Sequence, residues 1–150
     1  MFVTDPIGII GEEKAAQVIT SKGYKVVEHN WRLGHLEVDL IAESRKEIVF
    51  IEVKARTSTF GSRLPEEFVD SDKQRRMQIA ANAYIKQHKL EKTPRFDVFG
   101  ILVDPKTNEV TYCNHIEGCM HPQVRTTSSG SCSGSWKWIH RNKTIRNKRS

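Results

Sequence analysis

Three charged residues, Asp39, Glu52 and Lys54, stand in two neighbouring segments whose spacing could bring them together for metal-dependent chemistry. Both segments alternate apolar and charged residues as strands do, and side chains on a strand alternate between its two faces. Alternation predicts that Val38 and Leu40 share the face opposite Asp39. It also predicts that Glu52 and Lys54 share one face of the second strand, opposite its aliphatic residues.

A hairpin between these strands would bring the two carboxylates face to face. With the turn centred between Arg45 and Lys46, Asp39 falls opposite Glu52, with about 5 Å between the Cβ atoms. Two carboxylates at that distance repel, so a divalent cation between them would stabilise the arrangement. Oxygen ligands in a site open to water favour Mg²⁺, with Mn²⁺ as a substitute. The alternative is a ladder of surface salt bridges on a solvated sheet face.

Capping residues and periodicity predict the elements that must position these side chains. Asp5 before Pro6 favours a helix start and Gly23 a helix end, while Ser71 and Gln74 form a capping-box pair. Alternation and β-branched residues predict the strands. The predicted elements are a helix at 6–22, strands at 24–32, 36–43 and 47–56, a helix from 71 to about 88, and strands at 95–103 and 109–116. This order, αβββαββ, predicts an α/β fold with helices packed on a mixed sheet.

Two further charged residues fall where the helical pattern predicts apolar ones. Glu12 is in register with Ala15 and Ile19, the small apolar stripe that should face the sheet. Lys73 is similarly in register with Met77 on the second helix. Function is expected at such local departures from the pattern.

These residues resemble a known catalytic motif. Glu12, then Asp39, then the triplet Glu52-Val53-Lys54 resemble the PD-(D/E)xK motif of the restriction-endonuclease-like superfamily. A narrower resemblance rests on Lys73 and on the segments GEEKAA (11–16), GYKVVEHNWR (23–32), EVDLI (37–41), VFIEVKAR (49–56) and RFDV (95–98). With these the chain resembles the YraN family of small bacterial proteins, whose core is similar to that of archaeal Holliday-junction resolvases.

The resemblance covers about residues 6–116, and it implies a restriction-endonuclease-like αβββαβ core with a mixed central sheet flanked by helices. It implies that Asp39 and Glu52 bind Mg²⁺ or Mn²⁺ with help from the Val53 carbonyl. Lys54 would be the catalytic lysine, and Glu12 a further acidic member of the catalytic set. One departure is Leu36, where the family pattern has a glycine.

The implied function is metal-dependent hydrolysis of DNA phosphodiester bonds, with branched or junction structures as candidate substrates. Lys73 and Arg56 are candidate phosphate contacts, which would position nucleic acid without reading its sequence. By analogy with resolvases, which cut two strands, a symmetric homodimer is expected. Two alternatives are a catalytically inactive nucleic-acid-binding module of the same fold and an interaction protein with no nucleic-acid role.

The formal charge of +6 does not itself support nucleic-acid binding by the core. Residues 123–150 hold seven Lys/Arg and no Asp/Glu, whereas residues 1–122 hold seventeen Lys/Arg and all eighteen Asp/Glu, a net of −1. The composition predicts a domain at 1–122, which the resemblance implies is endonuclease-like, and a flexible basic tail at 123–150, which also fits a non-native extension. Trp136 and Trp138 could stack on bases, although a disordered tail is the preferred interpretation.

Apolar runs and cysteines point to a cytoplasmic protein without a membrane partner. No apolar run approaches the roughly 20 residues of a membrane span, and the N-terminus lacks the pattern of a signal peptide. The three cysteines are an odd, late-clustered set, which does not predict a disulfide framework. A zinc site at Cys113, His115, Cys119 and His121 is a further alternative, but this spacing is not typical of structural zinc sites.

Overall fold

The computed structural model describes residues 5–58, 65, 71–122 and 136–138; for 71, 119–122 and 136–138 it describes the backbone alone. In these residues the element order is αβββαβββ. The elements are α1 (Pro6–Ser21), β1 (Lys25–Leu33), β2 (Leu36–Glu43), β3 (Glu47–Thr57), α2 (Ser71–His88), β4 (Thr93–Val103), β5 (Val110–Pro122) and β6 (Trp136–Trp138).

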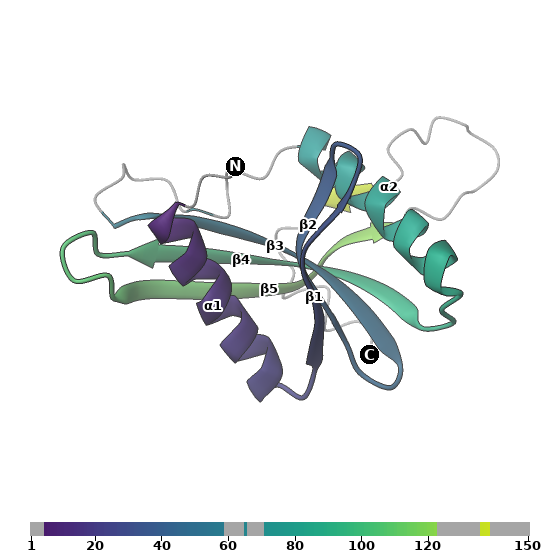
Figure 1. Cartoon of the computed structure of the whole chain (residues 1–150), viewed down its shortest axis with the longest axis horizontal. Coiled ribbons are helices and arrows are strands. Elements are labelled where there is room, and N and C mark those ends of the chain that lie inside the picture. The colour runs from purple at the N-terminus through teal and green to yellow at the C-terminus, as the bar shows by residue number, and fades with distance from the viewer. Residues whose placement is uncertain (1–4, 59–64, 66–70, 123–135, 139–150) are drawn as a thin grey trace.

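The strands form one mixed sheet in the order β1-β2-β3-β4-β5-β6. Neighbouring strands are antiparallel except β3 and β4, which are parallel and are therefore joined by a crossover through α2. Figure 1 shows α1 lying across the long strands and α2 beside the β1–β2 hairpin. The sheet and its flanking helices confirm the predicted α/β class and the restriction-endonuclease-like core.

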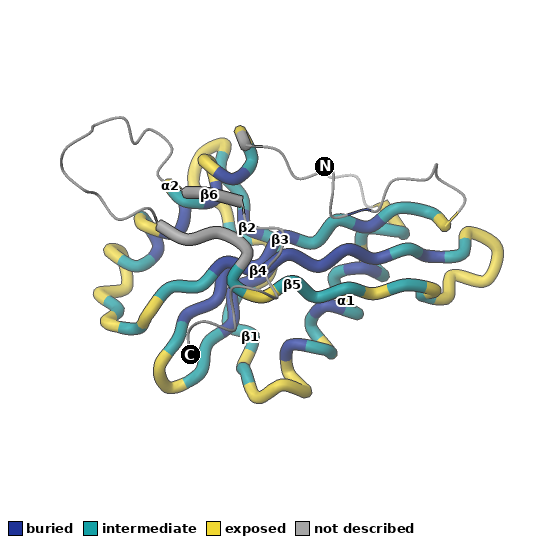
Figure 2. The backbone as a smooth tube through the Cα atoms, turned by 180° about the vertical axis from the view of Figure 1, so that it is seen from behind, coloured by how far each residue is buried: buried dark blue, intermediate teal, exposed yellow. Residues whose placement is uncertain are grey.

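Two hydrophobic clusters fill the two faces of the sheet. On the α2 face, Phe50 of β3 packs with Met77 and Tyr84 of α2. On the α1 face, Ile51 packs with Ala15 and Ile19. Figure 2 shows the buried residues concentrated along the middle of β3 and β4. Burial of this apolar surface, at about 25 cal/mol per Å², is what holds the helices to the sheet.

Close contact between α1 and β3 depends on a glycine. Gly11 is buried, and a Cβ atom added to it would lie 2.6 Å from the Cβ of Ala55. Only a residue without a side chain allows this approach of the helix backbone to the strand. The contact fixes the position of the next residue, Glu12, relative to the sheet.

The strands β2 and β3 separate at Asp39. Their pairing runs from Glu43↔Ile48 to Leu40↔Ile51, after which β2 continues with β1 alone. Figure 1 shows the β1–β2 hairpin turning away from the long strands toward α2. As a result, Val38 packs in the α2 cluster, whereas Leu40 packs in the α1 cluster. The prediction that Val38 and Leu40 share a face is therefore wrong, because β2 twists as it leaves β3.

The end of the chain adds one strand to the predicted elements. β5 continues past the predicted residue 116 to Pro122, and β6, from the predicted tail, pairs with it at Met120↔Trp138 and Pro122↔Trp136. The rest of the tail lies outside the described residues, so the division of the chain at residue 122 stays a prediction.

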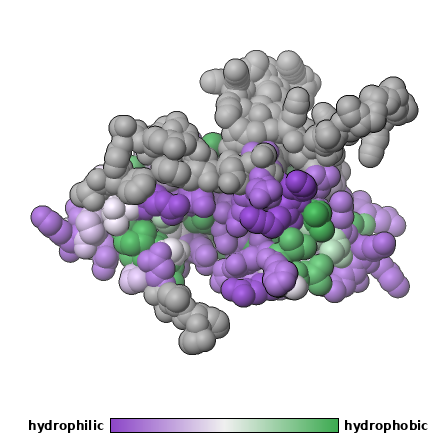
Figure 3. Space-filling view, turned by 90° about the horizontal axis from the view of Figure 1, so that it is seen from above, coloured by the Kyte–Doolittle hydropathy of each residue, from purple (hydrophilic) through white to green (hydrophobic). Residues whose placement is uncertain are grey.

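The described residues seen from above are mainly hydrophilic. Figure 3 shows apolar residues on this face in patches between charged and polar ones. The large exposed hydrophobic residues are Ile9, Leu33 and Ile79. In the described part of the chain, no helix is long and apolar enough to cross a membrane.

Candidate metal centre

Asp39 and Glu52 meet where β2 and β3 separate. The Leu40↔Ile51 pair has the register predicted for a turn between residues 45 and 46, and one further step puts Asp39 opposite Glu52. At that step the ladder ends, and Asp39 Oδ2 accepts a hydrogen bond of 2.7 Å from the backbone N–H of Val53. The predicted juxtaposition of the two carboxylates is thus found, and the carboxylate of Asp39 bridges the gap between the strands.

Glu52 is a buried carboxylate with one oxygen left unpaired. It is 2% exposed, on the face of β3 that also carries Phe50. Its Oε2 lies 3.5 Å from Lys73 Nζ and 4.0 Å from Lys54 Nζ. Its Oε1 is buried and has no hydrogen-bond partner among the described residues. Because a buried polar atom without a partner is costly and uncommon, Glu52 calls for an explanation beyond folding.

The surroundings of Asp39 and Glu52 oppose ionisation of both carboxyl groups at once. Burial, reinforced by the charge of Asp39, raises the pKa of Glu52 to about 8, although Lys73 and Lys54 act against this rise. Burial also raises the pKa of Asp39, and the hydrogen bond from Val53 works in the other direction. Near neutral pH the two carboxyl groups therefore resist ionising together unless a cation joins them.

A third carboxylate, Glu12 of α1, lies close enough to Asp39 for the two charges to repel. Burial, followed by repulsion from Asp39, raises the pKa of Glu12 to about 7. Asn30 Nδ2 of β1 donates to both Glu12 oxygens at 3.4 Å. The inward position predicted for Glu12 is therefore correct, and the helix brings it beside Asp39.

The predicted cations divide into two groups. Lys54 of β3 and Lys73 of α2 both converge on Glu52. Lys54 shares the strand face of Glu52, as predicted, and Lys73 points toward the packed side of α2, as predicted. Arg56 lies further along β3, where Nη1 donates 2.9 Å to the Ala55 carbonyl next to its own backbone. That hydrogen bond does not connect Arg56 to the carboxylates.

The donor set fits a hard divalent ion that keeps part of its water shell. Asp39 and Glu52 supply carboxylate oxygens, one of them unpaired, and Mg²⁺ is commonly held by one or two carboxylates plus water. Within the described ranges, no group of three or more His, Cys, Asp or Glu side chains could hold a metal ion. The ion would therefore depend on two side chains, with the remaining ligands from backbone or water.

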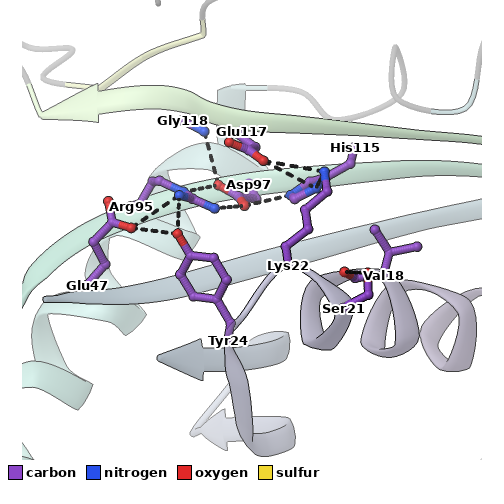
Figure 4. A network of polar contacts seen from close by, with 10 residues as sticks. All are labelled: Val18, Ser21, Lys22, Tyr24, Glu47, Arg95, Asp97, His115, Glu117 and Gly118. Atoms are coloured by element: carbon purple, nitrogen blue, oxygen red, sulfur yellow. Dashed lines mark hydrogen bonds and ion pairs between the residues drawn. The ribbon is translucent and has the colours of Figure 1, made fainter. Parts of the chain in front are cut away.

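A second buried charge network, on the α1 face, was missed by the sequence analysis (Figure 4). Arg95 donates to both oxygens of Asp97, at 2.9 and 2.7 Å, and the Gly118 N–H donates to Oδ1 at 3.0 Å. Lys22 donates 2.8 Å to His115 Nδ1, which leaves His115 Nε2–H to donate to Asp97 Oδ2 at 2.7 Å. The sequence did contain one sign of this network. Arg95 and Asp97 carry opposite charges two residues apart in an otherwise apolar strand.

The same network bears on the zinc alternative. Both ring nitrogens of His115 are hydrogen-bonded, and the ring stacks on Phe99 with 4.1 Å between centroids. Cys113 is exposed and not in a disulfide. The side chains of Cys119 and His121 lie outside the described residues. These contacts explain His115 as a structural residue of the sheet.

Comparison with known proteins identifies the family. The model described as "Uncharacterised protein family UPF0102" matches residues 11–101. The chain belongs to the UPF0102 family. This confirms the YraN resemblance, and the UPF0102 match spans the candidate site from Glu12 to Lys73.

Three UPF0102 relatives are similar over most of their length. A UPF0102 protein of Caldanaerobacter subterraneus subsp. tengcongensis is 41% identical over 112 residues, 73% of this chain and 90% of the relative. One of Syntrophomonas wolfei is 43% identical over 117 residues, 73% of this chain and 93% of the relative. One of Phocaeicola vulgatus is 38% identical over 115 residues, 76% of this chain and 91% of the relative.

Proposed function

We propose that this UPF0102 protein is a Mg²⁺- or Mn²⁺-dependent nuclease that hydrolyses DNA phosphodiester bonds at the Asp39–Glu52 site. The observation that carries the proposal is Glu52, a carboxylate that is 2% exposed, faces a second carboxylate and has one oxygen without a hydrogen-bond partner among the described residues. Buried carboxylates with raised pKa values and a specific charged partner cluster at functional sites.

Each residue of the site then has a role that follows from its position. Asp39 and Glu52 would hold the ion, with the Val53 carbonyl as a further ligand. When bound, a divalent ion supplies Lewis-acid activation of water and of the scissile phosphate. Lys54, whose Nζ lies 4.0 Å from Glu52 Oε2, would orient the attacking water or stabilise charge that develops on the phosphate. Glu12 adds a third carboxyl group next to Asp39.

Lys73 and Arg56 are the proposed phosphate contacts. Lys73 approaches Glu52 from the start of α2, so its ammonium group lies at the edge of the carboxylate pair. Branched or junction DNA and a symmetric homodimer belong to the same proposal and rest on analogy with resolvases. A cytoplasmic location also belongs to it and rests on the cysteine content of the sequence.

A second candidate function is a nucleic-acid-binding module of the same fold without turnover. The contacts of Lys54 and Lys73 with Glu52 favour it. Two ammonium groups partly neutralise this carboxylate, so that the site could persist without a metal ion.

A cleavage assay separates the two functions. Purified full-length protein is incubated with labelled four-way junction, linear duplex and single-stranded DNA, in Mg²⁺, Mn²⁺ or EDTA. We expect metal-dependent cleavage that falls at least about 100-fold in Glu52→Gln and Lys54→Met. Glu13→Gln, an exposed neighbour of Glu12 on α1, is the control and should cleave normally.

Salt-sensitive DNA binding without cleavage, unchanged by Asp39→Asn, would contradict the nuclease and support the binding module. Absence of both binding and cleavage would contradict both functions.

A further inference from the structure

Asn30 interrupts β1 directly opposite the candidate site. The pairs His29↔Leu40 and Trp31↔Val38 flank it, so the register places Asn30 across from Asp39. Its φ of 48° is in the left-handed region, which side chains other than asparagine and aspartate rarely adopt. Asn30 therefore breaks the regular course of an otherwise extended strand at the level of the carboxylates.

The Asn30 side chain reaches across to α1. Its Nδ2 lies 3.4 Å from each oxygen of Glu12, a residue 18 positions earlier in the chain. Glu12 is at the same time close enough to Asp39 for the two carboxylates to repel. A donor that contacts both Glu12 oxygens opposes this repulsion and limits rotation of the carboxylate.

We infer that Asn30 is a positioning residue of the site, whose side-chain amide holds the Glu12 carboxylate beside Asp39. This inference rests on the proposed metal-dependent function. Residues that hydrogen-bond to the acidic groups of a metal site orient them, and their loss commonly weakens metal binding. Asn30 combines the two properties that this place requires: an amide donor and tolerance of a left-handed backbone.

The two properties can be separated by substitution. Asn30→Gly keeps the left-handed conformation, which glycine adopts without strain, and removes only the amide. The matched control is Asn108→Gly, since Asn108 also has a left-handed backbone, with φ of 63°, but lies in the turn between β4 and β5. A change seen in Asn30→Gly and absent from Asn108→Gly is then due to the amide at the site.

The first measurement needs no metal. The side-chain amide resonances of Asn30 are recorded by NMR in the unmodified full-length protein, in Glu12→Gln and in Glu13→Gln. We expect a shift in Glu12→Gln and none in Glu13→Gln. Asn30 amide resonances that do not shift in Glu12→Gln would overturn the inference.

The second measurement is Mn²⁺ binding by calorimetry in the unmodified protein, Asn30→Gly, Glu12→Gln and the double variant. We expect Asn30→Gly to weaken Mn²⁺ binding about tenfold. In the Glu12→Gln background, Asn30→Gly should have no further effect, because the amide acts through Glu12.

The outcomes distinguish this inference from the proposed function. Unchanged Mn²⁺ affinity in Asn30→Gly, or an equal loss with and without Glu12, would overturn the inference alone. Absence of Mn²⁺ binding by the unmodified protein would overturn the metal-dependent function and, with it, the role of Asn30.

Discussion

The two faces of the sheet each bury a carboxylate, and the surroundings of the two groups differ. On the α1 face, Asp97 is fully buried, and both its oxygens accept hydrogen bonds from Arg95, His115 or Gly118. Burial would raise the pKa of Asp97, but hydrogen bonds from His115 and Arg95 hold it below its ordinary value. On the α2 face, Glu52 faces another carboxylate, and its pKa rises to about 8.

This difference separates a structural charge from a functional one. A buried ion that is paired and fully hydrogen-bonded can be explained by the fold that it holds together. A buried carboxyl group with an oxygen that lacks a hydrogen-bond partner, beside a second carboxyl group, is unfavourable for folding, which is the pattern expected where function retains a residue. The comparison therefore assigns the Asp97 network to the architecture, and it supports the proposed role of the Asp39–Glu52 pair in chemistry.

Removing the charge of Asp97 and removing that of Glu52 should have opposite effects on stability. The loss of stability at Asp97 is the largest effect that we predict. Asp97→Asn removes the buried charged partner of Arg95, which keeps its contact with Glu47, and should lower the free energy of unfolding by about 3–5 kcal/mol. Urea denaturation at neutral pH measures this loss. Retention of full stability would mean that the network does not support the fold, and the comparison would fail.

Glu52→Gln should instead stabilise the metal-free protein at alkaline pH, by about 2 kcal/mol. Since the folded-state pKa of about 8 lies above the ordinary 4.5, the contribution of Glu52 is present below pH 4.5 and is lost as pH rises through 8. Denaturation from pH 5 to pH 9 should therefore show a decline that Glu52→Gln reduces. Glu109→Gln, an exposed control, should keep the decline; an unchanged profile in Glu52→Gln would contradict the raised pKa.

The pH dependence due to Asp97 should have the other sign. Because its pKa is lowered from 3.8, its contribution is present above pH 3.8 and is lost as pH falls through the lower folded-state pKa. The stability difference between the unmodified protein and Asp97→Asn should thus shrink in acid. A difference that stays constant down to the acid transition would show that Asp97 is not paired as a carboxylate.

Gly11→Ala tests how α1 is held against the candidate site, with a smaller effect. The new Cβ would meet Ala55 at 2.6 Å, whereas in Gly8→Ala the nearest contact is an ordinary 3.5 Å. Gly8→Ala should stabilise the protein by up to about 1 kcal/mol through helix propensity. Gly11→Ala should lose about 1 kcal/mol, because overpacking outweighs that gain. Equal stabilisation by both substitutions would show that α1 is free to shift.

Features set by local pattern were predictable from the sequence. The faces of Glu52 and Lys54 follow from strand alternation, and the register of Asp39 follows from the turn at residues 45–46. The inward positions of Glu12 and Lys73 follow from helical spacing. Each of these needs only a short stretch of chain and its periodicity.

Features that depend on contacts between distant segments were not predictable. The twist that separates Val38 from Leu40 arises where β2 leaves β3, and alternation within β2 alone does not reveal it. The Asp97 network gathers groups from the C-cap of α1, from β4 and from β5. The contact of Asn30 with Glu12 requires a left-handed residue inside a strand, which strand propensity does not predict.

The most direct test of the central claim is the anomalous diffraction of a crystal soaked in Mn²⁺. The account predicts a single strong peak in contact with Asp39 and Glu52, with the Oε1 of Glu52 now among the ligands and Lys73 displaced from this carboxylate. A fully soaked crystal without a peak at this position, and with Glu52 still held by Lys73 and Lys54, would contradict it.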